Sequence, residues 1–482
     1  MKAALLGTGR FTPENQQDDL PIIARIGALG SDREDRFLKT AFTALLYEEA
    51  GAKPSKIDHT LPGCPPETRQ PAGDKITGLI HASLKDRNEV LFRYYLFRLV
   101  KSGKVLQSWL VPMVLNKALN SGKDRLQLLD ACGQAGQWLC RLNPKWSTTP
   151  ATAKGDENIW ETGTLEERKT YLTSLRKTDP EGAIALLENT LAEENAGNRL
   201  IFVQLLSEGL SLRDEPFLQK LTSDKSQKVK ETAFDLLKQI PGSALNHAYL
   251  EALTRVLEVR EEKHLLITKK KVLTIRGDMP LDDGLFKTGI ERVSREKGVE
   301  DYVYHAAQLM AWVDPVVLAN ALGTTEQQLI TFLLGQKAAG TLMPFLVRAA
   351  VRFRNKAWCF ALLHREEATD IRLLDALEES ERQAFYGRFL NNNLTGLLTY
   401  LFDDNYTPLP LKLAGDIIDY LIRFPYNVTQ AVYHRLALHL PVAAFAKLQA
   451  VINDPRQDYQ TRYFKTQASE MMRIKELIQQ ID

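Results

Sequence analysis

Apolar residues recur at intervals of three and four along most of the chain, the spacing that places them on one face of an α-helix. The stretch 89–100 is a clear case, because Leu91, Tyr95 and Leu99 fall on one stripe. The same spacing occurs over residues 35–50, 106–119, 125–139, 166–175, 184–192, 199–206, 229–240, 249–257 and 301–310. So many amphipathic stretches with short connections between them predict an all-α fold.

Helix start signals agree with this periodicity. The capping-box spacing occurs at Thr164/Glu167 and Thr324/Gln327, and aspartate followed by proline occurs at Asp179 and Asp314. In a capping box a side chain and a backbone amide satisfy each other, and proline fits the first helical position because its missing N–H is not needed there. Each of these sites therefore predicts the first turn of a helix.

Two stretches, 175–219 and 221–257, can be superimposed as helix–turn–helix units. Their leading aspartates, Asp179 and Asp224, are 45 positions apart. That period lies within the range of about 40 to 47 residues typical of HEAT-type helical pairs. We therefore expect a HEAT-like α-α superhelix, or solenoid.

Three segments interrupt the helical pattern. Residues 52–73 are rich in proline and predict an extended surface excursion, and residues 143–163 predict a polar loop. Residues 264–276 hold two β-branched runs around three lysines, which predicts a short β-hairpin as the one departure from the all-α fold.

The third interruption also suggests a division of the chain. We expect an N-terminal helical-repeat domain over 1–258, a connector with the hairpin over 259–285 and a C-terminal helical domain over 286–482.

Composition is that of an ordinary folded protein, with 44% hydrophobic and 25% charged residues. The formal net charge of +2 lacks the basic excess of a dedicated nucleic-acid binder. The four cysteines include no CxxC pair, and no window approaches the roughly 18 apolar residues of a membrane span. We therefore expect a protein of the reducing cytoplasm with no membrane partner.

Catalytic motifs are weak throughout. No P-loop is present, and the glycines near residue 9 and residue 133 lack the context of a dinucleotide site. Cys359 and His364 are five positions apart, which leaves a thiol hydrolase as a distant alternative. We accordingly predict no enzyme activity, no cofactor and no metal.

Two kinds of side chain remain as candidates for binding. Trp146 and Trp160 flank the polar loop and belong to a residue type that dominates protein interfaces. Two basic groups could meet an anionic partner. The first comprises Arg348, Arg352, Arg354 and Lys356, and the second comprises Arg93, Arg98, Lys101 and Lys104 with aromatic residues between them.

Several short strings resemble an uncharacterised bacterial family of helical-repeat proteins. They include ALLGTGR at residues 4–10, GQAGQWL at 133–139, NPKW at 143–146, IWETG at 159–163 and IPGSA at 240–244. The resemblance is specific over 3–250 and weaker beyond. Members are typically encoded beside MoxR-type AAA+ ATPases, von Willebrand factor A proteins and SWIM zinc-finger proteins, which implies a shared pathway.

These observations favour a non-enzymatic interaction scaffold or adaptor that serves a MoxR-type AAA+/von Willebrand factor A assembly through a protein partner. The alternative is a HEAT-like repeat protein that binds nucleic acid, including a base-excision glycosylase, with the arginines at 348, 352 and 354 on its binding face.

Overall fold

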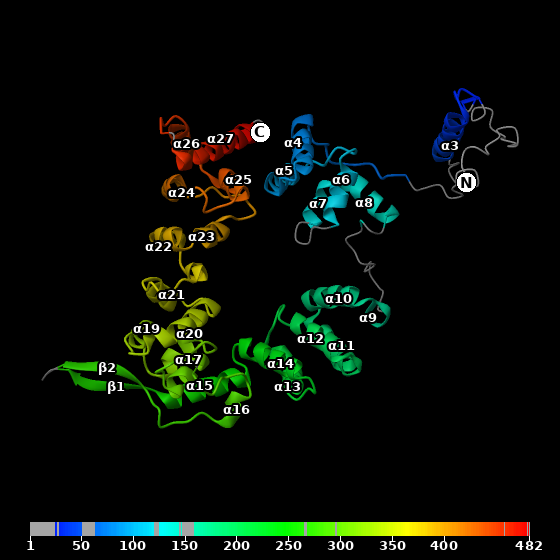
Figure 1. Ribbon diagram of the computed structural model, residues 1–482. Coiled ribbons are helices and arrows are strands. Elements are labelled where there is room, and N and C mark those ends of the chain that lie inside the picture. The colour runs from blue at the N-terminus through cyan, green and yellow to red at the C-terminus, as the bar shows by residue number, and fades with distance from the viewer. Residues whose placement is uncertain are drawn as a thin grey trace. The chain divides into compact units, whose positions relative to one another are not determined.

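The computed structural model is mostly helical, with one two-stranded antiparallel sheet in the part of the chain that it describes (Figure 1). It describes residues 25–26, 28–50, 63–119, 125–143, 146, 159–264, 268–294, 296–456, 458–479 and 481. This confirms the predicted all-α fold with a short hairpin. The chain divides into two compact units, Met1–Pro65 and Pro66–Asp482.

The first unit contains helix α3, Arg33–Ala50. Its first turn is closed by Asp32, whose carboxylate accepts a hydrogen bond from the Asp35 amide at 2.8 Å. Leu38, Phe42 and Leu45 have exposed side chains at the spacing of one helical face. Residues 52–62 of the predicted excursion 52–73 lie outside the described residues, and 63–73 contain no helix or strand.

The second unit begins with α4 (Asp74–Lys85), α5 (Glu89–Lys101), α6 (Val111–Ala118), α7 (Arg125–Ala131) and α8 (Gly133–Leu142). The prediction of a single helix over 125–139 is wrong, because α7 ends at Ala131 and α8 begins at Gly133. Gly133 has a φ of +59°, a left-handed conformation that ends a helix and that glycine adopts without steric cost.

A second group of helices has its own apolar core, made only of residues between Trp160 and Ile240. It comprises α9 (Ile159–Thr162), α10 (Leu165–Thr178), α11 (Pro180–Thr190), α12 (Ala196–Leu205), α13 (Glu215–Leu221) and α14 (Gln227–Gln239), with 3₁₀ turns at Leu191–Glu193 and Leu212–Asp214. Within it, Arg176 and Asp214 form a fully buried bidentate ion pair with N···O distances of 2.8 and 3.1 Å.

The hairpin follows α15, Ala244–Val256. Strand β1, Leu257–His264, pairs with β2, Thr268–Ile275, so that Leu257 lies opposite Ile275 and Glu261 opposite Lys271. The predicted position is corrected, because the first strand begins seven residues earlier than residue 264 and the three lysines belong to β2. Strand β1 is rich in charged residues and holds a single β-branched residue, Val259, so a search for β-branched runs does not find it.

The remaining helices continue to the C-terminal end. They are α16 (Asp283–Phe286), α17 (Asp301–Met310), α18 (Pro315–Ala321), α19 (Glu326–Leu334), α20 (Ala339–Arg352), α21 (Lys356–Leu363), α22 (Glu379–Asn392), α23 (Leu394–Leu401), α24 (Leu411–Arg423), α25 (Gln430–His439), α26 (Phe445–Ile452) and α27 (Tyr459–Gln479), with 3₁₀ turns at Ile371–Ala376 and Val442–Ala444.

The predicted helix starts are confirmed at Thr164, Asp179 and Asp314. At the fourth start the prediction is wrong by one position. The capping box there is formed by Thr325 and Gln328, because the preceding turn ends one residue later than the sequence suggests.

A single apolar core joins α4–α8 to the helices from α15 to α27. Helix α5 contacts α25, and the Asn88 side-chain amide donates to Nδ1 of His434 at 3.1 Å across 346 positions of sequence. This core crosses the predicted boundaries at residues 258 and 286, while the division into domains itself stays a prediction.

Candidate functional site

One face of α5 carries aromatic and basic side chains together. Tyr94, Phe97, Arg98 and Lys101 recur at intervals of three and one, which places them along a single stripe of the helix. Asn88 caps this helix by accepting a hydrogen bond from the Leu91 amide, so the stripe has a fixed start. These four side chains form one wall of a pocket of about 620 Å³.

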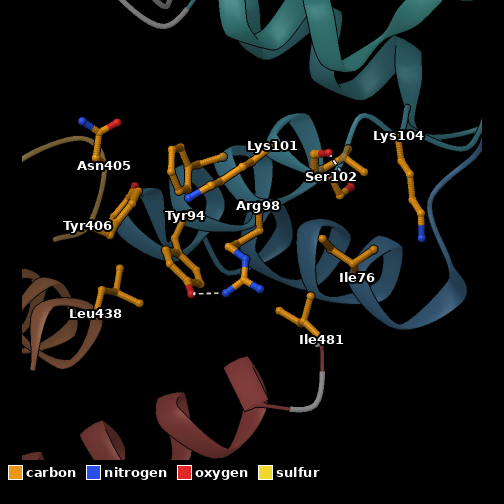
Figure 2. A pocket seen from close by; sticks show the side chains of 12 residues that line it. Ile76, Tyr94, Arg98, Lys101, Ser102, Lys104, Asn405, Tyr406, Leu438 and Ile481 are labelled. Atoms are coloured by element: carbon orange, nitrogen blue, oxygen red, sulfur yellow. Dashed lines mark hydrogen bonds between the residues drawn. The ribbon is translucent and has the colours of Figure 1, made fainter. Parts of the chain in front are cut away.

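The opposite wall comes from the C-terminal third of the sequence. Asn405 and Tyr406 belong to the loop between α23 and α24, Leu438 lies on α25, and Ile481 follows α27 (Figure 2). The remaining lining residues are Ile76, Leu99, Ser102 and Lys104. The pocket is thus assembled from segments that are more than 300 positions apart.

Tyr406 links the two walls. Its ring centroid lies 4.8 Å from that of Tyr94 and 5.1 Å from that of Phe97. The Tyr406 backbone has a φ of +56°, a conformation that costs a non-glycine residue roughly 1–2 kcal/mol and that surrounding contacts must therefore stabilise. Burial raises the pKa of the Tyr406 phenol to about 12, so the ring is neutral at physiological pH.

Among the described residues that line the pocket, every charged side chain is positive. Arg98 donates to the Tyr94 hydroxyl at 3.1 Å, and the Lys101 amine lies 5.5 Å from the centroid of the Phe97 ring. Figure 2 shows the Arg98 guanidinium between Tyr94 and Ile481, with Lys104 at the far side. No aspartate or glutamate is among the lining residues that the structure describes. Such a site favours an anionic group with a flat or apolar body beside it.

Asp404 adjoins Asn405 in the sequence but is not among the described residues that line the pocket. Its carboxylate lies 3.7 Å from the Arg435 guanidinium and is highly exposed. Exposed pairs of this kind are worth about 1 kcal/mol or less. Arg435 and Asp404 both act electrostatically on the Tyr406 phenol, in opposite directions, so charges outside the lining also contribute to the field in the pocket.

Sequence reasoning found part of this site. Arg98, Lys101 and Lys104 belong to the second predicted basic group and do meet in the pocket, whereas Arg93 forms an ion pair with Glu89 at 3.3 Å. Asn405 and Tyr406 were not predicted, because only the tertiary contact between α5 and the C-terminal helices brings them there.

Trp160 does not present a binding surface. Its side chain is 4% exposed, its indole N–H donates to the Thr190 hydroxyl at 3.1 Å, and the Arg168 guanidinium lies 4.5 Å from the ring centroid. The prediction of an interface role is wrong here, because the ring fills the core of its own helical group beside Phe202.

Trp146 is half-buried and packs against the large core. Its indole N–H donates to the Asn116 side chain at 2.9 Å. Most of the polar loop around it lies outside the described residues. An interface role for Trp146 stays a prediction.

The first predicted basic group is divided. Lys356 forms an ion pair with Glu381 at 2.9 Å. Arg348 and Arg352 lie against aromatic rings, with the Arg348 guanidinium 5.1 Å from the Phe345 centroid and that of Arg352 3.7 Å from the Trp312 centroid. Three exposed arginines, including Arg354, thus remain as a patch at the end of α20.

The Cys359 thiol is not placed to act as the nucleophile of a thiol hydrolase. That side chain is fully buried, its thiol donates to the Ala350 carbonyl, and burial raises its pKa to about 12. Over the described ranges, no cluster of three or more His, Cys, Asp or Glu side chains has the arrangement of a metal site. Nor does any helix in those ranges have the length and apolar character needed to cross a membrane.

Fold and site together define an all-α protein with a basic, aromatic-lined pocket. The chain belongs to a family of unknown function (DUF5691), whose profile matches residues 1–482. No curated protein matches it. Among solved structures it is similar to the crystal structure of an engineered protein, with 11% identity, a TM-score of 0.24, and coverage of 83% of this chain and 99% of that one, a likeness too small to carry an argument.

Proposed function

We propose that this protein is a non-enzymatic interaction scaffold that holds an acidic segment of a partner protein in the pocket along α5. The observation that carries the proposal is the lining of that pocket, where the exposed Lys101 and Lys104 lie beside three aromatic rings and no described lining residue is a carboxylate. An acidic segment would bring negative charge to these two lysines, and its apolar atoms would pack on the rings.

The helical arrangement supports a repeat scaffold of the HEAT-like kind. Between α10 and α14 the contacts link near neighbours in the chain: α10 touches α11 and α12, α12 touches α14, and α13 touches α14. Nearest-neighbour contacts of this type are typical of stacked helical repeats, which leave a long surface available for recognition. The scaffold would thus present the pocket without needing chemistry of its own.

The partner class comes from the family resemblance. In the family that the sequence resembles, members are typically encoded beside MoxR-type AAA+ ATPases and von Willebrand factor A proteins. The ATPase and the von Willebrand factor A protein encoded beside this chain are therefore the first partners to test. We place this interaction in the cytoplasm, where such ATPases hydrolyse ATP.

The test is direct binding between purified proteins by biolayer interferometry, with and without ATP. Lys101 and Lys104 are exposed, and no ion pair involves either of them among the described residues. Reversing both charges with Lys101→Glu and Lys104→Glu should weaken partner binding at least about tenfold, or about 1.4 kcal/mol. Lys412→Glu, an exposed lysine on α24, makes a matched control that should bind like the wild type.

Two outcomes would overturn the proposal. If neither candidate protein binds the wild-type chain in either nucleotide state, the assigned partner class is wrong. If a candidate binds but the double variant and the Lys412→Glu control retain equal affinity, the pocket is not the contact site.

A further inference from the structure

A second group of cations lies at the end of α20, on elements that do not line the pocket. Arg348 and Arg352 are one helical turn apart, and Arg354 follows in a left-handed backbone conformation with a φ of +47°. All three side chains are exposed. The end of a helix carries partial negative charge, which helps to hold cations at this position.

Aromatic rings orient two of these guanidinium groups. The ring of Trp312 has the Arg352 guanidinium 3.7 Å from its centroid and the Lys238 amine 4.8 Å from it, while Arg348 lies over Phe345. Contact with a ring face fixes a planar guanidinium without using its N–H donors. The donors at the edges therefore stay available for a ligand.

The protein supplies no acceptor to these donors. Across the described residues, none of the three arginine side chains forms a hydrogen bond or an ion pair, whereas nearby Lys356 is paired with Glu381 and Lys238 with Asp235 at 2.5 Å. Packing on Trp312, with Arg348 close by, lowers the pKa of Arg352 to about 10, so the group is still charged at neutral pH. An anion would compensate this partly desolvated charge.

We infer that Arg348, Arg352 and Arg354 form a binding site for the phosphate backbone of nucleic acid, read without regard to base sequence. A guanidinium fork matches two oxygens of a phosphate group, and a nucleic acid strand brings one phosphate with every nucleotide. Three neighbouring forks can thus be satisfied by one strand.

The neighbouring amide of Asn355 is not available to read a base edge. Asn355 would be the natural reader of a base edge, but its Oδ1 accepts from the Trp358 amide and its Nδ2 donates to Glu326. Arginine can itself read guanine, so the comparison of two sequences below tests whether these contacts are to phosphates, which give position and charge and no sequence specificity.

The experiment measures fluorescence anisotropy of a labelled 20-base-pair DNA duplex with the full chain at 50 and 200 mM NaCl, using two unrelated sequences. Three phosphate contacts predict a loss of affinity of about 40-fold between these salt concentrations, equal for both sequences. Replacing all three arginines with glutamine should weaken binding at least about tenfold at 50 mM NaCl and flatten the salt dependence. Lys356→Gln, which removes a neighbouring cation that is already paired, should leave the affinity unchanged.

If circular dichroism shows that the triple variant does not fold, the single variant Arg348→Gln tests the inference. It should reduce the slope of log affinity against log salt concentration by about 1. The inference is overturned if the wild type does not bind DNA at 50 mM NaCl, or if Lys356→Gln weakens binding as much as Arg348→Gln. It is also overturned if polyglutamate displaces the duplex at equal charge concentration, since the ligand is then an acidic protein. Lys101→Glu with Lys104→Glu should not change DNA affinity, so this test is separate from that of the pocket.

Discussion

The indole of Trp160 makes three kinds of contact at once. It packs against Phe202 with ring centroids 4.9 Å apart, lies beside the Arg168 guanidinium and donates a hydrogen bond to Thr190. Residues of this kind contribute to stability through buried area, cation–π attraction and a satisfied donor together. We therefore expect Trp160 to stabilise the folded state.

Trp160→Ala should accordingly lower the free energy of unfolding by about 3–5 kcal/mol, because a large cavity replaces the ring. Urea unfolding followed by circular dichroism measures the change. Trp109→Ala is the matched control, since that side chain is 53% exposed and its removal should change stability by only about 0.5 kcal/mol. Equal effects of the two substitutions would contradict the core assignment.

Individual side chains also mark the limit of sequence reasoning. Trp146 and Trp160 look alike in the sequence, since both flank a polar loop, yet one is half-buried and the other is in a core. Burial depends on which helices pack nearby, and neighbouring residues in the sequence do not encode that. By contrast, the basic character around Arg348 and Arg98 is readable, because helical spacing alone puts such side chains on one face.

Helices and their ends were the most predictable elements. The apolar period of α5 and the caps at Thr164, Asp179 and Asp314 depend on residues within one or two turns, so local sequence determines them. The break at Gly133 was missed because the apolar stripe continues across it. Its cause is non-local: a Cβ there would lie 2.1 Å from the Glu67 carboxylate, which accepts a hydrogen bond from the Gln134 amide.

Gly133→Ala should therefore destabilise the protein by at least about 1–2 kcal/mol, the cost of a left-handed conformation for alanine, before any displacement of Glu67. Gly78→Ala is the counterpart with the opposite expected sign. Gly78 lies in an exposed position within α4 with no atom near the new methyl group, so alanine should stabilise the helix by up to about 1 kcal/mol. Thermal unfolding of the two variants tests this, and a shift in the same direction for both would refute the argument.

At the scale of the whole molecule, the pocket depends on the contact between α5 and α25. The hydrogen bond between Asn88 and His434 joins these helices, and Nδ1 of His434 must be unprotonated to accept it. Burial lowers the pKa of His434, although Glu470 acts in the opposite direction. No sequence pattern connects residues so far apart, which is why only the α5 wall of the pocket was predictable.

A lowered histidine pKa has a defined consequence for stability. The contribution of neutral His434 is complete above its ordinary pKa of 6.5 and declines as the pH falls below that value, because the unfolded chain then binds a proton that the folded chain does not. The urea midpoint should therefore decrease between pH 7.5 and pH 5.5. His434→Gln, which cannot titrate, should make this decrease smaller, and an unchanged slope in the variant would contradict the assignment.

The same long-range contact has a consequence for biosynthesis. After Asn88 leaves the ribosome, His434 emerges only 346 residues later, which takes roughly 20 to 70 s at ordinary elongation rates. During that interval the apolar face of α5 has no C-terminal helices to pack against and is a natural target for molecular chaperones. A nascent chain that still lacks Tyr406, Leu438 and Ile481 has only one wall of the pocket, so it cannot enclose a ligand there.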